Sequence, residues 1–266
     1  MEHSGLLNEN YNWHLSLSEH ISALRLKCLL CLDGDFSLLK ITDHPVWINL
    51  VSIGSAHTPM EMISFQEYYA IKGIQICHLW EDVWLTKPNQ VLARITSLTG
   101  LNKRIHGRQT IVRKIDKKQA SDFLNVHHLQ GAVNSRYKLG LYFKDELVAV
   151  ATFASLRNMN YSEKFRSSEL IRFAVKSNYS VNGGLSKLIA FFVDLTKPDD
   201  LMTYADRDWS AGAAYFGLGF ELTDILPPQR FTIDADLHRS RLIDSLNVTS
   251  VSNTGSLKFI LRLTDV

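Results

Sequence analysis

The stretch that decides the fold is LGLYFKDELVAVATF, residues 139–153. Two runs of mostly apolar residues flank the pair Lys144-Asp145. A short polar break between two such runs is typical of a β-hairpin. We therefore predict two adjacent antiparallel strands joined by a tight turn.

The elements predicted on either side of this hairpin alternate between strand and helix. Residues 109–115 predict a strand, and residues 117–129 predict an amphipathic helix. Past the hairpin the patterns predict a strand, a helix, a strand, a short helix and the beginnings of two more strands, at 169–175, 185–195, 201–205, 211–218, 219–220 and 231–233. This order predicts an α/β (α+β) fold in which helices flank a mixed sheet.

The first hundred residues predict a separate and smaller α/β domain. The alternating run 73–80 predicts a strand. Residues 89–99 have apolar side chains at helical spacing, and Gly100 is a typical helix terminator. We place the boundary after this helix, which predicts a small domain over residues 1–102 and a larger domain over residues 103–266.

Three passages make the larger domain similar to the GNAT superfamily of N-acetyltransferases over residues 109–233. They are the hairpin YFKDELVAV (142–150), the helix opening GGLSKL (183–188), and AAYFGLGF (213–220), which resembles the family's tyrosine-bearing helix followed by Gly-Phe. The resemblance implies an acyltransferase with acetyl-CoA or another acyl donor as cofactor. It also implies that Tyr215 protonates the departing thiolate.

Within that superfamily the chain most resembles phage DNA-modification proteins of the Mom kind and phage proteins labelled endonucleases. The latter share SELIRF (168–173), GGLSK (183–187) and YADRDWS (204–210) with this chain. Mom-type proteins depend on a His, an Arg, a Ser, an Asp and a Tyr. The residues at similar spacing here are His128, with His127 as its neighbour, Arg172, Ser186, Asp206 and Tyr215. This resemblance implies a transferase that modifies a DNA base, adenine.

A fainter resemblance covers the first domain. There, GIQICHLWEDVW (73–84) is similar to the end of a very-short-patch-repair-type nuclease domain. Such a nuclease needs clustered acids and often a Lys or His to hold a metal ion and activate water. Asp33, Asp35 and Glu61 are present, but the sequence shows no complete set. We therefore expect a shortened, inactive relative that positions DNA, and we assign no metal ligand.

Basic residues are concentrated just after the proposed boundary. Residues 1–102 contain 6 Lys and Arg against 10 Asp and Glu, whereas residues 103–138 contain 9 against 2. A local excess of this size predicts either a solvated basic face or a polyanion partner, and we expect DNA. The candidate contacts to nucleic acid are Arg104, Arg108, Arg113, Lys114, Arg136 and Lys138.

The glycine pair at 183–184 is the candidate binding site for the donor. Main-chain N–H groups at the start of a helix bind phosphates, and glycines let the backbone approach closely. The residues expected to hold the acyl donor are Gly183, Gly184, Leu185, Ser186 and Lys187. A DNA phosphate, or a turn with only a structural role, would account for the same passage.

The catalytic candidates also have structural alternatives. Tyr215 fits a general acid or a core tyrosine, and Asp206 fits an acceptor-binding carboxylate or part of a helix cap. Arg172, a charge in an apolar strand, fits an anion-binding group or an ion pair with Glu169 or Asp206. His128 fits a base or an exposed histidine at a helix end.

The predicted topology brings four of these candidates to one edge of the sheet. Neighbouring parallel strands end at the same edge, and ligands bind there in α/β proteins. We therefore expect Arg172, Ser186, Asp206 and Tyr215 to converge.

Composition and cysteine content restrict the class of protein. The chain has 45% hydrophobic and 21% charged residues, as in ordinary globular proteins. No apolar run approaches the ~18 residues of a membrane span, and residues 1–10 lack the regions of a secretory signal. The three cysteines predict free thiols in a reducing cytoplasm, and the alternative is a zinc site at Cys28, Cys31, Cys77 and His78.

The expected function is therefore a GNAT-fold transferase that acts on DNA, of phage or mobile-element origin. Two alternatives remain open from the sequence. One is a DNA-binding, homing-endonuclease-like protein without transferase activity. The other is a conventional N-acetyltransferase that uses acetyl-CoA.

Overall fold

The computed structural model describes residues 3–159, 164–241 and 249–263. The chain divides into two compact units. The first unit comprises residues 1–92, 206–211 and 225–256, and the second comprises residues 93–205, 212–224 and 257–266. The domain boundary expected after residue 102 stays a prediction. None of the described helices is both long and apolar enough to cross a membrane.

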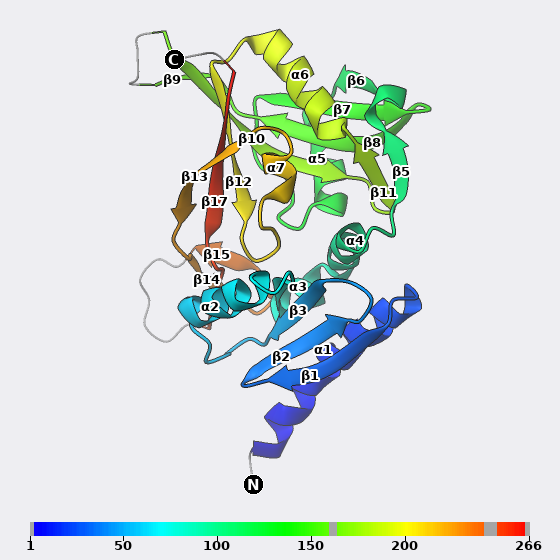
Figure 1. Cartoon of the computed structure of the whole chain (residues 1–266), viewed down its shortest axis with the longest axis vertical. Helices are drawn as coiled ribbons and strands as arrows, with labels where there is room; N and C mark the ends of the chain where they lie inside the picture. Colours follow the sequence, from blue (N-terminus) through cyan, green and yellow to red (C-terminus); the bar gives the residue numbers. More distant parts are fainter. Residues whose placement is uncertain (1–2, 160–163, 242–248, 264–266) are drawn as a thin grey trace. The chain divides into compact units, whose positions relative to one another are not determined.

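A four-stranded sheet with the order β1-β2-β3-β4 forms the centre of the first unit (Figure 1). Strands β1 to β3 are successive antiparallel neighbours, and β4 lies parallel to β3. A smaller sheet has the order β15-β14-β16. The elements are α1 (His3–Ala23), β1 (Cys28–Asp33), β2 (Phe36–Ile41), β3 (Val46–Val51), α2 (Pro59–Ala70), β4 (Gln75–Trp80), α3 (Glu81–Thr86), β14 (Arg230–Ile233), β15 (Arg239–Arg241) and β16 (Ser250–Ser252).

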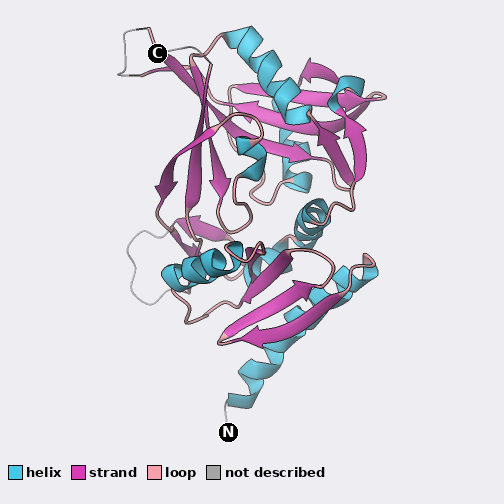
Figure 2. Ribbon diagram, in the orientation of Figure 1, coloured by secondary structure: helices cyan, strands magenta, loops and turns pink. Residues whose placement is uncertain are grey.

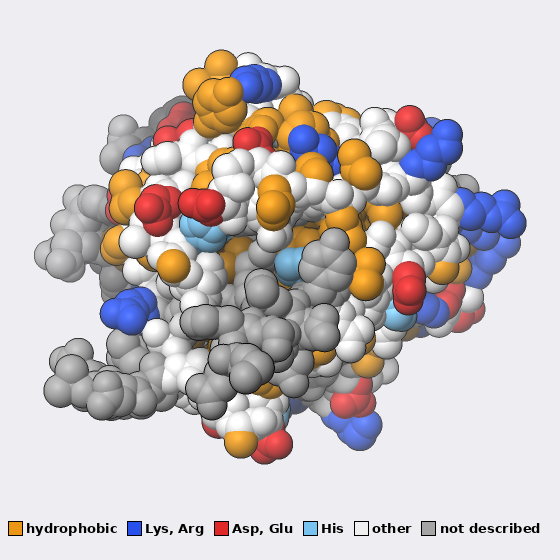
Figure 3. All heavy atoms as spheres, turned by 90° about the horizontal axis from the view of Figure 1, so that it is seen from below, with side chains coloured by type: hydrophobic (Ala, Val, Ile, Leu, Met, Phe, Trp, Pro, Cys, Tyr) orange, Lys and Arg blue, Asp and Glu red, His pale blue; other side chains and the backbone are white. Residues whose placement is uncertain are grey.

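Local sequence explains how helix α2 begins in the first unit. The Thr58 side chain accepts the N–H of Glu61, and the Glu61 carboxylate accepts the N–H of Thr58 at 2.7 Å. This reciprocal capping box satisfies N–H groups that the helix itself leaves unpaired. Ile71 of this unit is 89% exposed. Figure 3 shows one face of the molecule, where hydrophobic side chains lie among charges of both signs.

An eight-stranded sheet forms the centre of the second unit, with the order β13-β17-β12-β10-β8-β7-β6 and β9 beside β10. A parallel pair, β5 and β11, forms a separate ribbon. The elements are α4 (Pro88–Leu98, which the division crosses), β5 (Lys103–His106), η1 (Gly107–Gln109), β6 (Ile111–Lys114), α5 (Lys117–His127), β7 (Tyr137–Phe143), β8 (Glu146–Phe153), β9 (Arg157–Asn158), β10 (Arg166–Val175), β11 (Tyr179–Asn182), α6 (Gly184–Thr196), β12 (Asp200–Asp206), α7 (Ala213–Phe216), β13 (Glu221–Leu226) and β17 (Ser256–Arg262).

Helices α6 and α5 cover opposite faces of this sheet (Figure 2). The main core contains Phe192 of α6, whose ring stacks on Phe153 of β8 with the centroids 4.0 Å apart. A second cluster contains Phe123 of α5 with Val150 of β8. Val150 and Phe153 lie an odd number of positions apart and so point to opposite faces. Burial on both faces explains why β8 reads as a nearly continuous apolar run.

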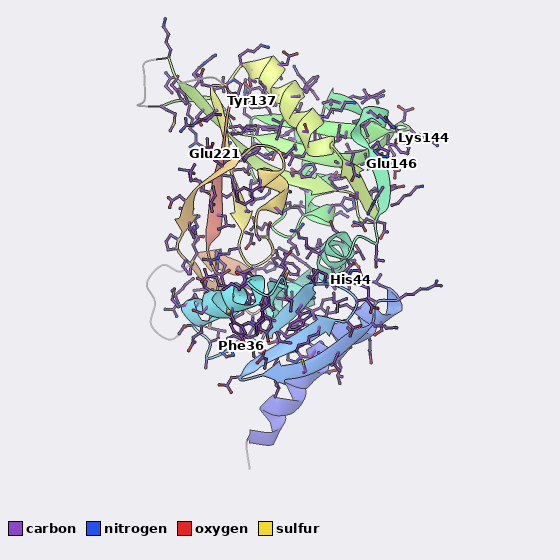
Figure 4. The ribbon with its side chains drawn as sticks, viewed as in Figure 1. Phe36, His44, Tyr137, Lys144, Glu146 and Glu221 are labelled. Atoms are coloured by element: carbon purple, nitrogen blue, oxygen red, sulfur yellow. The ribbon has the colours of Figure 1, made fainter. Side chains whose placement is uncertain are left out.

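The hairpin predicted from residues 139–153 is confirmed. Strands β7 and β8 pair antiparallel, and Lys144 and Asp145 form the turn with φ of 48° and 62°. Two positive φ angles in a row define a type I′ turn, which matches the twist of the strands. Figure 4 labels Lys144 and Glu146 at this end of the hairpin. The expected class, α/β with a mixed sheet flanked by helices, is confirmed as well.

Candidate active site

Strands β10 and β12 pair over only part of their length. They are parallel from Ser167–Asp200 to Leu170–Thr203. Beyond that point β10 continues to Val175 and β12 continues to Asp206, but these two strands no longer pair with each other. On its other side β10 stays paired with β8. The register of β10 against β8 also shifts between Leu170 and Arg172.

We call the parted stretches, residues 171–175 and 204–205, the fork. β10 and β12 do not pair with each other here, so their facing edges are where an extended ligand would pair with main-chain groups. Such a ligand would bind as an added strand does.

Tyr215 lies at the fork on the short helix α7. Its ring packs between Phe220 and Phe259, with centroid separations of 5.5 and 5.3 Å. Its side chain hydrogen-bonds Thr203, and the Thr203 hydroxyl donates to the carbonyl of Leu170 at 3.0 Å.

The environment of Tyr215 keeps its phenol protonated. Burial raises the pKa of Tyr215 above its ordinary value of 10, although the bond to Thr203 and the charges of Arg94 and Arg172 partly offset this. A phenol that holds its proton at neutral pH and lies beside the fork is suited to act as a general acid.

Arg172 connects the fork to the loop after α5. Its Nε donates to the carbonyl of Gly131 at 3.2 Å, and its Nη1 donates to the carbonyl of Ile171 at 2.9 Å. The N–H of Gly131 donates to the carbonyl of His128 at 3.0 Å. Arg172 is thus half-buried near Tyr215, on which its charge acts, and it also holds the loop that carries His128.

The two adjacent histidines have different surroundings. The Nδ1 atom of His128 accepts the N–H of Gln130 at 3.1 Å, next to the end of α5. The Nδ1 atom of His127 lies 3.1 Å from the Ser177 hydroxyl, and burial lowers the pKa of His127. His128 is therefore the histidine whose loop Arg172 holds.

The predicted donor residues surround the start of α6. Gly183 caps the helix with φ of 73°, in the left-handed region that favours glycine. A Cβ on Gly184 would lie 2.8 Å from Val181 Cγ1, so this glycine is required for packing, and Leu185 is buried in the main core. Ser186 is exposed in the first turn of the helix.

Lys187 already has main-chain partners. Its ammonium donates to the carbonyls of Gly107, at 3.0 Å, and Thr110. It thereby holds the turn that contains η1 against the first turn of α6. Its expected contact with the donor stays a prediction, because these two carbonyls already use part of its hydrogen-bonding capacity.

Asp206 lies in the first unit, unlike the other three members of the predicted convergent set. Its carboxylate accepts the N–H of Asp208 at 3.1 Å. The segment that follows is bound within that unit: His78 N–H donates to the Asp208 carbonyl at 2.9 Å, and Gln75 donates to the Trp209 carbonyl at 3.2 Å. The structure thus associates Arg172 with Tyr215, and convergence of all four residues stays a prediction.

The six predicted nucleic-acid contacts do not share one face. On β6, Val112 packs into the main core on the α6 side, and Ile115 packs into the cluster under α5. Side chains alternate along a strand, so Arg113 lies on the α5 face and Lys114 on the α6 face. Arg113 also pairs with Asp145 at 3.0 Å.

The remaining predicted contacts differ in exposure. Lys138 donates to the Ser135 carbonyl at 2.6 Å and is half-buried. Arg104, Arg108 and Arg136 are exposed.

Two residues of the site were missed by the sequence analysis. Thr203 binds the phenol of Tyr215, and Arg94 contributes to its electrostatic environment. Thr203 gives no local signal, because a threonine in a strand is ordinary. Arg94 lies in a helix that the sequence indicated only as a boundary.

The first unit contains a buried ionic cluster, formed by Asp82 and Arg239 with Asp208 and Thr254. Arg239 donates to both carboxylate oxygens of Asp82, at 2.6 and 2.8 Å. One carboxylate oxygen of Asp208 accepts both the N–H and the hydroxyl of Thr254, at 2.8 and 2.6 Å. Burial, with Asp206 adding to it, raises the pKa of Asp208 to about 7.

Potential metal ligands are not grouped in the described part of the chain. No three or more His, Cys, Asp or Glu residues there could together hold a metal ion. Cys28, Cys31 and Cys77 are free thiols.

Comparisons with known proteins find likeness only in three dimensions. No family model and no curated protein matches the sequence. Three similar solved structures are a NatC complex bound to Gag peptide and CoA, a Bacillus subtilis acetyltransferase in complex with CoA, and a GNAT family acetyltransferase from Elizabethkingia anophelis with acetyl-CoA bound. Their TM-scores are 0.38, 0.39 and 0.36, with 13%, 12% and 12% identity. Each likeness covers 58 or 59% of this chain and 99% of the other.

Proposed function

We propose that this protein is an acyltransferase that moves an acetyl group from acetyl-CoA to a nitrogen atom of its acceptor. The observation that carries the proposal is the fork with Tyr215 beside it. The parallel pairing of β10 and β12 stops at Leu170–Thr203, and the phenol is hydrogen-bonded to Thr203 at that point. A protonated acid thus lies where two strands offer main-chain groups to a ligand.

The residues present fit acetyl-CoA. The donor has an extended arm with amide groups, and the parted strands can pair with these amides. It also has a pyrophosphate, which suits the N-terminus of α6, where Gly183 has positive φ and no atom within 4 Å of a Cβ built on it. When bound, acetyl-CoA supplies the acetyl group as an activated thioester.

The chain's own residues would support three parts of the reaction. Main-chain N–H groups of β10 that face the fork would stabilise negative charge on the reacting carbonyl oxygen. Tyr215 holds a proton that it can give to the departing sulfur, and the proton that the acceptor nitrogen loses would restore the phenol. Arg172 holds the loop with His128 on the α5 side of the sheet, where we place the acceptor.

The finer proposal concerns the acceptor, a DNA base as in Mom-type proteins of phages, with the first unit as a DNA-positioning module. The charge excess of residues 103–138 supports it. A conventional amine acceptor fits the fork equally well. An adenine in a duplex would have to be flipped out or presented in a single strand.

Calorimetry with acetyl-CoA and an acetyl-transfer assay test the proposal. We expect wild type to bind acetyl-CoA, and we expect Tyr215→Phe to bind it equally well but to transfer acetyl about 10²–10⁴-fold more slowly. Mass spectrometry of nucleosides, with amines and peptides tested in parallel, then identifies the acceptor. Absence of acetyl-CoA binding by folded wild-type protein would contradict the proposal.

A further inference from the structure

The ribbon of β5 and β11 places two arginines beside the start of α6. The parallel register sets Arg104 opposite Ser180, Ile105 opposite Val181 and His106 opposite Asn182. Asn182 directly precedes Gly183, the cap of α6. The end of β5 therefore lies next to the start of that helix.

One face of this ribbon is buried and the other is open. Ile105 is 2% and Val181 8% exposed, and both belong to the main core. Side chains alternate along each strand, so Arg104 and His106 lie on the opposite, outer face. Both are exposed.

The turn after β5 is held tightly against α6, which fixes the position of Arg108. A Cβ on Gly107 would lie only 2.9 Å from the Gly183 carbonyl oxygen, so the two backbones touch. The Thr110 hydroxyl closes the turn by donating to the Gly107 carbonyl at 2.6 Å, and Lys187 donates to that same carbonyl. Arg108 is exposed between these anchored residues.

The segments that carry the two arginines contain only basic charged residues, and the carboxylate nearest to the ribbon, Glu146, accepts the ammonium of Lys176. Residues 103–115 and 176–193, which form the ribbon, the turn and most of α6, contain no Asp or Glu. Among the residues that the structure describes, neither Arg104 nor Arg108 takes part in an ion pair. A guanidinium group stays charged, and it can bind two oxygens of one phosphate with two parallel hydrogen bonds.

We infer that Arg104 and Arg108 bind the ribose 3′-phosphate of the acetyl-CoA donor. The inference rests on the proposed function, which assigns the pyrophosphate to the start of α6. The 3′-phosphate belongs to the same nucleotide and lies a few bonds away from that pyrophosphate. Two arginines held beside the helix start are therefore suited to bind it, and β5 with its turn acts as part of the donor site.

The test compares acetyl-CoA with 3′-dephospho-acetyl-CoA by calorimetry. We expect Arg104→Gln and Arg108→Gln each to weaken acetyl-CoA binding about ten-fold, since each removes a charge-assisted hydrogen bond. Binding of the dephosphorylated donor should change less than about two-fold, because the group that the arginines contact is absent. The matched control Lys118→Gln removes an exposed charge on α5, where Lys118 pairs with Asp122, and should affect neither ligand.

The other outcomes separate this inference from the proposed function. If the arginine variants lose affinity equally for both donors, or lose affinity for neither, the 3′-phosphate assignment is overturned. Failure of wild type to bind either donor would instead overturn the proposed function. The variants could instead still bind acetyl-CoA more tightly than the dephosphorylated donor, as wild type does, but lose salt-dependent binding to a DNA duplex. The arginines would then bind DNA phosphodiesters, and the inference would be wrong.

Discussion

The fork in the second unit and the ionic cluster in the first unit use polar groups in opposite ways. In the cluster, Arg239 occupies both oxygens of Asp82, and the Asp82 side chain is only 3% exposed. At the fork, two strands part, and a half-buried phenol lies beside them. Polar groups that occupy one another stabilise a fold, whereas groups left for a ligand can do chemistry.

This difference separates two readings of a perturbed pKa. Burial raises the pKa of both Asp208 and Tyr215. Asp208 is buried, and one of its carboxylate oxygens accepts two hydrogen bonds from Thr254. Its raised pKa therefore affects the stability of the fold. Tyr215 lies at the fork, where β10 and β12 stop pairing, so a phenol that keeps its proton there is suited to proton donation.

The largest expected effect is on the cluster. Asp82→Ala leaves the guanidinium of Arg239 without its carboxylate, and breaking a buried pair costs about 3–5 kcal/mol. The free energy of unfolding, measured in urea, should fall by that amount. The control Glu67→Gln removes the partner of Arg207, but the Glu67 side chain is 62% exposed, so a change below about 1 kcal/mol is expected. If Asp82→Ala lowered the free energy of unfolding by no more than Glu67→Gln does, the cluster would not be a stabilising element.

A second prediction concerns pH and Asp208. Its folded-state pKa is raised from 3.8 to about 7, so between these values the folded protein holds a proton that the unfolded chain has lost. The contribution of Asp208 to the free energy of unfolding is therefore fully present below about pH 4 and is lost as the pH rises through 7.

The variant Asp208→Asn mimics the protonated acid and keeps the oxygen that Thr254 binds. Above pH 7 it should be more stable than wild type by on the order of 2 kcal/mol, with the gain vanishing at low pH. Urea titrations of both proteins from pH 4 to 9 measure this difference. A difference that is constant with pH would contradict the assignment.

The smallest expected effect lies at the fork. Thr203→Val removes the hydroxyl that hydrogen-bonds the Tyr215 phenol, so the phenol loses its orientation. We expect kcat for acetyl transfer to fall about five-fold to ten-fold, since a hydrogen bond contributes about 1 kcal/mol. The KM for acetyl-CoA should stay nearly constant. Serine at the same position keeps the hydroxyl and should restore kcat. A rise in KM for acetyl-CoA with kcat unchanged would instead show that Thr203 acts in donor binding.

Much of the fold follows from short-range patterns in the sequence. The hairpin was predictable because two apolar runs flank Lys144-Asp145, and that turn adopts the expected positive φ angles. Helix α6 follows from the glycine pair and the apolar spacing after it. These features depend on neighbours within a few residues, which a single sequence displays.

The candidate site was predictable only in part. The sequence alone makes Tyr215, Arg172 and the passage around Gly183 candidates, because their residue types match the chemistry. Thr203 and Arg94 were not, since nothing local distinguishes a strand threonine or a helical arginine. The placement of 206–211 within the first unit was not predictable either, because it depends on hydrogen bonds to residues such as His78, more than a hundred positions away.

The sequence by itself determined the hairpin, the helix after the glycine pair and the excess of basic residues after position 102. Only the tertiary structure decided where those basic residues lie: Arg113 and Lys114 on opposite faces of the sheet, and Arg104 and Arg108 beside the start of α6. It also decided that β10 and β12 part after four paired positions. The physical reason is that periodicity and turn chemistry act between near neighbours, whereas strand register is set by packing between distant segments.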